Sequence, residues 1–227
     1  MNQPFKLIIA GGKTGGHLFP GIAVAQAVER LNSDPTEALF VGTDAPFEVN
    51  TLAGYGYAHR AIYSKPIKGG SLISKLISVS VILVSVIQSL VIMRQFRPDF
   101  VIGVGGFSSF AVVLSAWLLG IPTALQEQNA VPGMTNRMLS RFARTIFTSF
   151  EQTKGFTDNP KTQFTGNPVR KSAEADSSTF SSSASSSSLG PDPDPDRFTL
   201  LITGGSQGAA SINRAVLDAM KSLPGAD

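Results

Sequence analysis

The residues of this chain with the clearest potential for chemistry lie in a glycine-rich loop that ends in a histidine. Residues 11–17 read GGKTGGH and directly follow an apolar run at 5–10. Glycine lets the backbone approach a ligand closely, and the N–H groups of such a loop and of a following helix N-terminus favour an anion such as a phosphate. His17 falls in the first turn of the expected helix, where the helix dipole disfavours its cation. We therefore interpret His17 as a candidate general base that stays neutral.

The loop by itself leaves two interpretations open. Thr14 can cap the helix or donate to a phosphate, and Gly15 and Gly16 can admit a ligand. The same residues also suit a helix-capping turn with a structural histidine. The loop is not a Walker A sequence, because Lys13 precedes Thr14 but the Gly-x4-Gly-Lys-Ser/Thr spacing is absent.

Two further apolar runs end in glycine-rich loops. Residues 100–104 (FVIGV) continue into GGFSS at 105–109, and residues 198–203 (FTLLIT) continue into GGSQGA at 204–209. A strand, a tight glycine turn and a helix N-terminus together form an anion site. Three such sequences indicate a protein that handles phosphate or diphosphate groups.

Four polar residues, QEQN at 126–129, follow a fourth apolar run. Glu127 can orient His17 or a sugar hydroxyl, and Asn129 can bind an amide or a hydroxyl. The alternative is a hydrogen-bonded surface turn that ends at 132–133 (PG).

A GNPVR sequence at 166–170 closes this part of the chain. Arg170 can pair bidentately with a diphosphate, although a solvated surface arginine is the alternative. Asn136 and Arg137 carry the same ambiguity. His59 has no partner pattern and is interpreted as structural.

Short apolar runs alternate with helix-like stretches, which predicts a doubly wound, Rossmann-like parallel α/β sheet. Strands are expected near 5–10, 38–42, 100–104, 122–126, 144–148 and 198–203. Helices are expected near 17–32, 72–96, 107–119, 132–142 and 208–222. Ligands of such sheets bind at the carboxyl ends of the strands, where all three glycine loops fall.

The composition divides the chain into three parts. Residues 1–171 form the predicted Rossmann-like domain. Residues 172–196 are rich in Ser, Pro and Asp, which predicts a disordered linker or a loop insertion. Residues 197–227 hold one strand, loop and helix, which cannot bury their own faces, so we expect them to be the start of a second domain that the chain does not complete.

Residues 76–93 contain no charged residue. Lysines precede this segment, and arginines follow it. This length is marginal for a transmembrane helix. The nearby polar residues share one helical face: Ser74, Ser78, Ser85, Gln88 and Ser89. This stripe favours a crossover helix that packs on the sheet and touches an anionic membrane surface with its remaining apolar face. A purely buried helix and a true span are the alternatives.

The composition excludes several classes of protein. A net charge of +3 (19 − 16) in 227 residues does not suit a dedicated nucleic-acid binder. The chain has no Cys and only 2 His, which excludes disulfides and thiol catalysis and argues against a zinc site. A dinucleotide oxidoreductase is disfavoured because no Gly-x-Gly-x-x-Gly occurs in the first turn.

Taken together, the three glycine loops, QEQN with TNR at 135–137, and GNPVR resemble the MurG family, bacterial glycosyltransferases of peptidoglycan synthesis that belong to glycosyltransferase family 28. The motifs occur in that family's order and cover nearly the whole chain except the Ser/Pro/Asp-rich segment. The resemblance implies a GT-B fold of two facing Rossmann-like halves. This chain would hold the N-terminal half and the first strand, loop and helix of the second.

The resemblance also implies a reaction. This is the inverting transfer of N-acetylglucosamine from UDP-GlcNAc (UDP-N-acetylglucosamine) to the 4-hydroxyl of the muramoyl sugar of lipid I, which gives lipid II without a metal or other cofactor. The implied partners are the donor UDP-GlcNAc, the polyprenyl-diphosphate-linked acceptor and an anionic membrane surface, with no nucleic acid. The implied location is peripheral, on the cytoplasmic face of the inner membrane.

By matching motif, His17 and Glu127 would be the catalytic residues beside the acceptor hydroxyl. The donor would contact a second set: Thr14, Gly15, Gly16, Asn129, Arg170 and Ser206. Two positions depart from the family pattern: Lys13 stands where many members have a further glycine, and residues 107–110 (FSSF) replace a more usual Tyr-x-Ser-Gly. The alternatives are another GT-B nucleotide-sugar transferase and a noncatalytic membrane-surface fragment.

We predict that the purified 227-residue chain transfers no sugar on its own. The reason is that the family's remaining donor contacts lie beyond the third glycine loop, close to which this sequence ends. The measurement is transfer of radiolabelled N-acetylglucosamine to a lipid I analogue. Transfer above a blank without protein would contradict the prediction.

Overall fold

The computed structural model describes most of the chain: residues 3–64, 72–170, 202, 204 and 209–222. For 72–77 it describes the backbone alone. The chain divides into two compact units, Met1–Ser177 and Ser178–Asp227. The linker predicted at 172–196 lies outside the described residues, so its bounds stay predictions.

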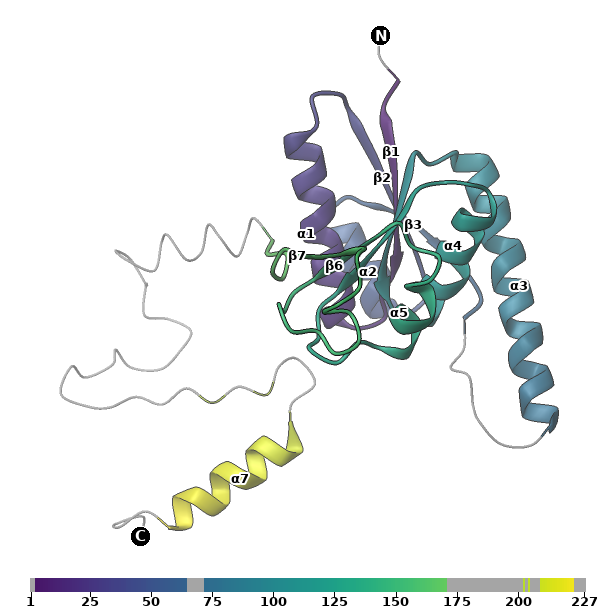
Figure 1. Cartoon of the computed structure of the whole chain (residues 1–227). Coiled ribbons are helices and arrows are strands. Elements are labelled where there is room, and N and C mark those ends of the chain that lie inside the picture. Colours follow the sequence, from purple (N-terminus) through teal and green to yellow (C-terminus); the bar gives the residue numbers. More distant parts are fainter. Residues whose placement is uncertain (1–2, 65–71, 171–201, 203, 205–208, 223–227) are drawn as a thin grey trace. The chain divides into compact units, whose positions relative to one another are not determined.

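A seven-stranded parallel sheet forms the centre of the first unit (Figure 1). Its strands are β1 (Phe5–Gly11), β2 (Thr36–Gly42), β3 (Ala58–Ala61), β4 (Phe100–Gly105), β5 (Thr123–Glu127), β6 (Thr145–Thr148) and β7 (Thr162–Phe164). They lie in the order β3-β2-β1-β4-β5-β6-β7, and all neighbours are parallel. After β3 the chain returns to place β4 beside β1, on the side opposite β2. The order of strand addition therefore reverses between β1 and β4, and the expected doubly wound sheet is confirmed.

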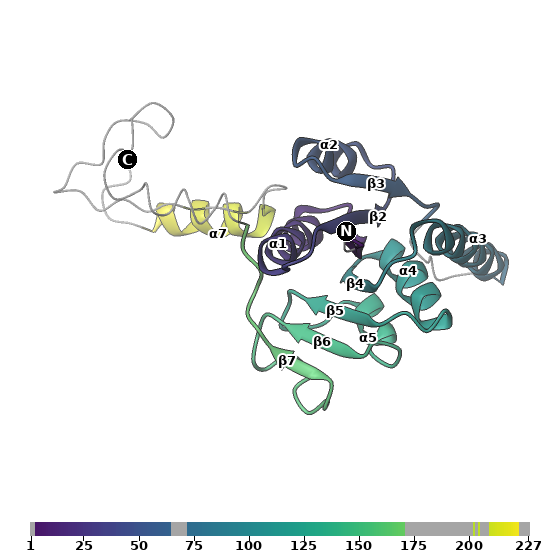
Figure 2. The ribbon, with the colours of Figure 1, turned by 90° about the horizontal axis from the view of Figure 1, so that it is seen from above.

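Helices cover both faces of this sheet, which explains the continuous apolar runs of the sequence (Figure 2). They are α1 (Gly15–Leu31), α2 (Pro46–Gly54), α3 (Leu72–Phe96), α4 (Phe107–Leu118) and α5 (Met134–Leu139). Successive side chains of β1 point to opposite faces. Leu7 and Ile9 join a core with α1 and α2, whereas Ile8 and Ala10 join a second core with α3, α4 and α5.

Two edge strands and one helix are absent from the elements predicted from sequence. β3 (AHRA) and β7 (TQF) lie at the two edges of the sheet, where mostly exposed side chains give no continuous apolar run. α2 begins with Pro46 and buries only Glu48 and Leu52, too few for a clear helical pattern. The helix expected at 132–142 is shorter, because Gly133 is the N-cap of α5 and Ser140 is its C-cap.

The polar side of α3 faces the protein. Ser85 and Ser89 are buried, and their hydroxyls donate to carbonyls of α3 itself, those of Val81 and Ser85. Ser115 of α4 donates to the Val86 carbonyl at 3.3 Å. The expected crossover helix therefore packs mainly on α4 instead of directly on the sheet.

The opposite side of α3 is apolar and exposed. We call these residues the outer face of α3: Val79, Leu83, Val84, Ile87 and Val91. By length and composition, Ser78–Phe96 is long and apolar enough to cross a membrane, and 17% of that stretch is buried in the protein.

The described helix of the second unit is α7 (Ala210–Lys221), which lies within the helix expected at 208–222. None of its side chains is buried. The strand expected at 198–203 lies, apart from Ile202, outside the described residues.

Candidate functional site

The first two glycine loops meet where the strand order reverses. We call residues 11–16 loop 1 and residues 105–106 loop 2; they leave the carboxyl ends of β1 and β4, the position where open parallel sheets bind ligands. Gly11 pairs with Gly105, with an irregular register after Ala10. A Cβ on Gly11 would clash with the carbonyl oxygen of Gly105. This approach of two backbones therefore requires glycine.

His17 lies against loop 2. A Cβ on Gly105 would be 2.7 Å from His17 Cδ2 and 2.9 Å from His17 Nε2, so the imidazole fills the space that Gly105 leaves free. Gly105 has a φ of +99°, which also favours glycine. The Nε2 edge of the ring therefore lies at the junction of the two loops.

Thr14 contacts the other ring nitrogen. Its Oγ1 lies 3.0 Å from His17 Nδ1. Thr14 is the N-cap of α1, but its side chain makes no capping bond, and its carbonyl accepts the N–H groups of His17 and Leu18 at 3.1 and 3.0 Å. The hydroxyl thus serves the imidazole instead of the helix end. When Nδ1–H donates to this hydroxyl, Nε2 carries the free lone pair at loop 2.

Burial favours the neutral form of His17. Desolvation lowers the pKa of His17 from its usual value, and the negative charge of Glu127 opposes part of this shift. A neutral imidazole with a free lone pair is the form that accepts a proton.

Glu127 is buried, and donors from the next few residues occupy both of its oxygens. Oε1 accepts from the backbone N–H and the side-chain amide of Asn129, both at 3.0 Å. Oε2 accepts from Gly133 N–H at 3.1 Å and from Asn136 Nδ2 at 2.9 Å. These bonds close the segment between β5 and α5. The negative charge of Glu127 raises the pKa of His17. The predicted place of Glu127 beside an acceptor hydroxyl stays a prediction.

A polar network continues from this segment toward the end of the first unit. Asn136 is buried, and its Nδ2 also donates to the Gln126 carbonyl at 3.1 Å. Gln126 Nε2 donates to Ser149 Oγ at 3.2 Å, and Ser149 donates to Asn167 Oδ1 at 3.3 Å. Asn129, which donates to Glu127, is exposed to solvent. Polar residues from both sequence motifs, QEQN and GNPVR, are therefore brought together.

Arg170 packs on aromatic rings beside the start of α1. Its guanidinium carbon lies 4.0 Å from the ring centroid of Phe19, and Nη1 donates to the Tyr55 hydroxyl at 2.5 Å. Phe19 in turn lies next to Gly15, where a Cβ would be 3.0 Å from the ring. Arg170 is thus held near loop 1 instead of extending into solvent. Ser206 and the third glycine loop lie outside the described residues, apart from Gly204 and Ala209.

Glu48 contacts loop 1 and is not among the site residues predicted from sequence. Its carboxylate is fully buried and accepts the Lys13 N–H at 2.9 Å. The available signal is a glutamate that follows β2 by a few residues, at the same edge of the sheet as loop 1. Burial of that glutamate depends on α2, which the sequence pattern does not reveal.

Comparison with known proteins assigns the chain to a family. Residues 7–148 match the Glycosyltransferase family 28 N-terminal domain. The chain belongs to glycosyltransferase family 28.

Relatives of similar sequence share one name, UDP-N-acetylglucosamine–N-acetylmuramyl-(pentapeptide) pyrophosphoryl-undecaprenol N-acetylglucosamine transferase. The relative from Myxococcus xanthus is 40% identical over 218 residues, which cover 96% of this chain and 54% of the relative. The relative from Citrifermentans bemidjiense is 42% identical over 221 residues, which cover 97% and 58%. The chain therefore spans little more than half the length of these relatives.

Solved structures are similar to this chain in fold. The crystal structure of Acinetobacter baumannii MurG is similar with a TM-score of 0.70 and 28% identity, over 97% of this chain and 58% of that one. A UDP-GlcNAc 2-epimerase from Neisseria meningitidis, bound to UDP-GlcNAc, is similar with a TM-score of 0.54 and 17% identity, over 71% and 46%. The second likeness shows the fold alone. The predicted family and the predicted half of a GT-B fold are confirmed.

We predict that His17 makes the first unit less stable in mild acid. Because burial lowers the pKa of His17 in the folded chain below its usual value near 6.5, the unfolded chain binds more protons as the pH falls below about 6.5. The free energy of unfolding therefore decreases as the pH falls from about 6.5 toward the lowered pKa of His17. Above about pH 6.5 the stability that depends on neutral His17 is fully present. Urea unfolding at several pH values measures the effect. An unchanged slope in His17→Gln would contradict the prediction.

Proposed function

We propose that this chain is the acceptor-side part of a transferase that moves N-acetylglucosamine from UDP-GlcNAc to lipid I, giving lipid II for peptidoglycan. One observation carries the proposal: His17, whose Nδ1 lies 3.0 Å from the Thr14 hydroxyl oxygen, lies at the junction of two glycine loops, and burial lowers its pKa. Membership of family 28 and the names of the similar relatives support it.

His17 is the general base of the proposed reaction. With Nδ1–H donating to Thr14, Nε2 removes the proton of the acceptor's 4-hydroxyl while that oxygen attacks the anomeric carbon of the donor. The bond from this carbon to the diphosphate breaks, and its electron pair leaves with UDP. Attack from the face opposite the leaving group inverts the anomeric centre. The charge of Glu127 stabilises the imidazolium that forms, which then releases its proton to water.

Two diphosphates need stabilisation in this scheme. We propose that loops 1 and 2 face the lipid diphosphate, with the N-terminus of α4 directed at its charge. The donor contacts that we propose are Thr14, Gly15, Gly16, Asn129, Arg170 and Ser206. The position of the Arg170 cation over Phe19, which borders Gly15, supports a donor site at this end of α1.

We propose that the reaction uses no metal ion or other cofactor. A cationic side chain and helix N-termini can take over the stabilisation of the leaving diphosphate. Within the described ranges, no three His, Asp or Glu side chains gather into a possible metal site.

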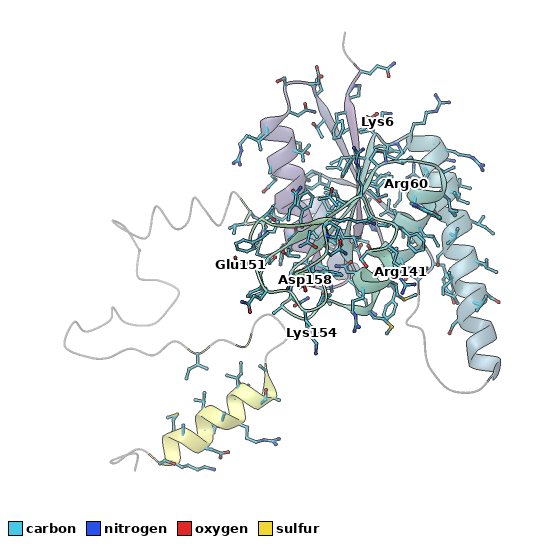
Figure 3. All side chains as sticks on the ribbon, viewed as in Figure 1. Lys6, Arg60, Arg141, Glu151, Lys154 and Asp158 are labelled. Atoms are coloured by element: carbon cyan, nitrogen blue, oxygen red, sulfur yellow. The ribbon has the colours of Figure 1, made fainter. Side chains whose placement is uncertain are left out.

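We propose a peripheral position on the cytoplasmic face of the inner membrane, and the exposed apolar outer face of α3 supports contact with a membrane surface. In Figure 3 side chains of α3 project away from the rest of the unit, and the labelled charged residues Glu151, Lys154 and Asp158 lie elsewhere. The inner side of α3 is buried against α4, which favours a helix that lies on the membrane over one that crosses it. Arg94 and Arg97 are exposed where α3 ends and suit an anionic surface.

Two other functions would share parts of this site. Another GT-B nucleotide-sugar transferase would use the same loops with a different acceptor, and the acceptor preference decides between them. A noncatalytic membrane-surface protein would keep only the outer face of α3. Vesicle binding without donor binding or transfer would favour that reading.

We predict sugar transfer by an extended chain, in which this chain is followed by the part of the Myxococcus xanthus relative that lies beyond the match. His17→Ala in the extended chain should lower kcat by about 10²–10⁴-fold, the usual contribution of a general base. The measurement is conversion of a lipid I analogue to the disaccharide product. Lys154→Ala, at an exposed residue, is the control and should leave kcat unchanged. A folded extended chain without transfer, or with full activity after His17→Ala, would refute the proposal.

We predict that Ile87→Glu weakens binding to vesicles that contain anionic phospholipid by about tenfold or more, because it removes apolar contact worth at least 1.5 kcal/mol. Ile87 is 60% exposed, so the thermal unfolding midpoint should stay unchanged. Leu31→Glu is the matched control, since Leu31 is an exposed apolar residue at the end of α1. Equal loss of vesicle binding in both variants would contradict a role for the outer face of α3.

A further inference from the structure

Glu48 is a buried carboxylate that the proposed mechanism does not use. It is 0% exposed and lies in the first turn of α2. Its Oε2 accepts hydrogen bonds from Lys13 N–H at 2.9 Å, from the Thr43 hydroxyl at 2.8 Å and from Thr43 N–H at 3.2 Å. One side chain therefore joins loop 1 to the residue that follows β2.

Two glycines make room for this carboxylate. A Cβ on Gly12 would lie 2.5 Å from both Cδ and Oε1 of Glu48, and a Cβ on Gly42 would clash with Oε1. Gly12 belongs to loop 1 and Gly42 ends β2, so the carboxylate is inserted between the two segments. His59 of β3 is a third neighbour, with Nε2 at 3.5 Å from Oε1.

The residue that Glu48 holds has an unusual backbone conformation. Lys13 has a φ of +71°, a left-handed conformation that residues other than glycine, asparagine and aspartate rarely adopt. The bond from its N–H to Glu48 restrains this turn. Thr14 follows directly, and its hydroxyl contacts Nδ1 of His17.

Loop 1 and loop 2 are also close to each other next to this turn. A Cβ on Gly106 would be 3.7 Å from the Gly12 carbonyl oxygen, so the two backbones are close neighbours. A change in the path of loop 1 at Gly12 and Lys13 would therefore alter both its contact with loop 2 and the position of Thr14.

We infer that Glu48 is a positioning residue for the proposed transfer. By holding the Lys13 N–H it fixes the conformation of loop 1 that places Thr14 and His17 against loop 2. Its kinetic consequence rests on the proposed function, whereas the order that it gives to loop 1 is measurable without activity.

Glu48→Leu tests the inference, because leucine has a similar volume but leaves the donors of Lys13 and Thr43 without an acceptor. Glu48→Gln is the conservative rescue, since it keeps one acceptor oxygen. In the 227-residue chain, hydrogen exchange of a peptide that covers loop 1 should be about tenfold faster in Glu48→Leu and close to wild type in Glu48→Gln. Exchange in β4 and β5 should stay at the wild-type rate, because the effect is local.

In the extended chain, Glu48→Leu should lower kcat by about 100-fold, the cost of misplacing a catalytic group by about 1 Å, whereas Glu48→Gln should stay within about threefold of wild type. Glu29→Leu is the matched control, because it removes an exposed carboxylate on α1 and should change neither readout.

Glu48→Asp shortens the side chain by one methylene and should change both readouts in the direction of Glu48→Leu. It decides the question if Glu48→Leu does not fold.

Three results would overturn the inference: wild-type exchange in loop 1, wild-type kcat in an active extended chain, or equally faster exchange in loop 1, β4 and β5. The last result would make Glu48 a residue of general stability. If the unsubstituted extended chain transfers no sugar, the proposed function fails, and the exchange measurement alone then decides the role of Glu48.

Discussion

The contact between the backbones of loop 1 and loop 2 is the constraint on which the site depends. β1 and β4 are neighbours because the strand order reverses between them, so loops far apart in sequence leave the sheet side by side. Glycine at Gly11 allows the two backbone segments to approach this closely, because a Cβ there would clash with the Gly105 carbonyl oxygen. The space left above Gly105 then receives the imidazole of His17. The position of His17, the catalytic group that we propose, thus depends on the missing Cβ of Gly105 as well as on α1.

Two buried carboxylates organise the two sides of this contact. An isolated carboxylate in the protein interior is costly, so each has to be surrounded by donors. Glu127 takes its donors from the segment between β5 and α5 and from α5 itself, while Glu48 takes them from loop 1 and from the residue after β2. The first closes a loop within one stretch of chain, and the second joins stretches that are distant in sequence. Neither needs a ligand to satisfy its hydrogen bonds.

The sequence was sufficient to predict the central strands, because both faces of the sheet are covered and the strands read as unbroken apolar runs. It was also sufficient to predict loop 1 and the place of His17 in the first turn of the following helix, since glycine and histidine can be read directly from the sequence. The edge strands were missed because exposed positions carry no such pattern. Glu48 was missed because its burial results from tertiary packing of α2, and a glutamate in sequence gives no sign of its surroundings.

The stripe of serines on α3 was visible in the sequence, but the sequence did not show that this stripe faces the protein. Serine hydroxyls can donate to carbonyls of their own helix, which lowers the cost of burying a polar side.

The inward serines of α3 have a consequence for how such a surface can change over time. The helix is fixed to the rest of the unit through its inner side, by hydrogen bonds and by the packing of Met93. The residues of the outer face are about half exposed, and among the described residues they do not belong to the buried cores. Apolar exchanges there should leave the fold and the site unchanged, so selection could adapt the proposed membrane-contacting surface to a new lipid composition independently of the proposed chemistry.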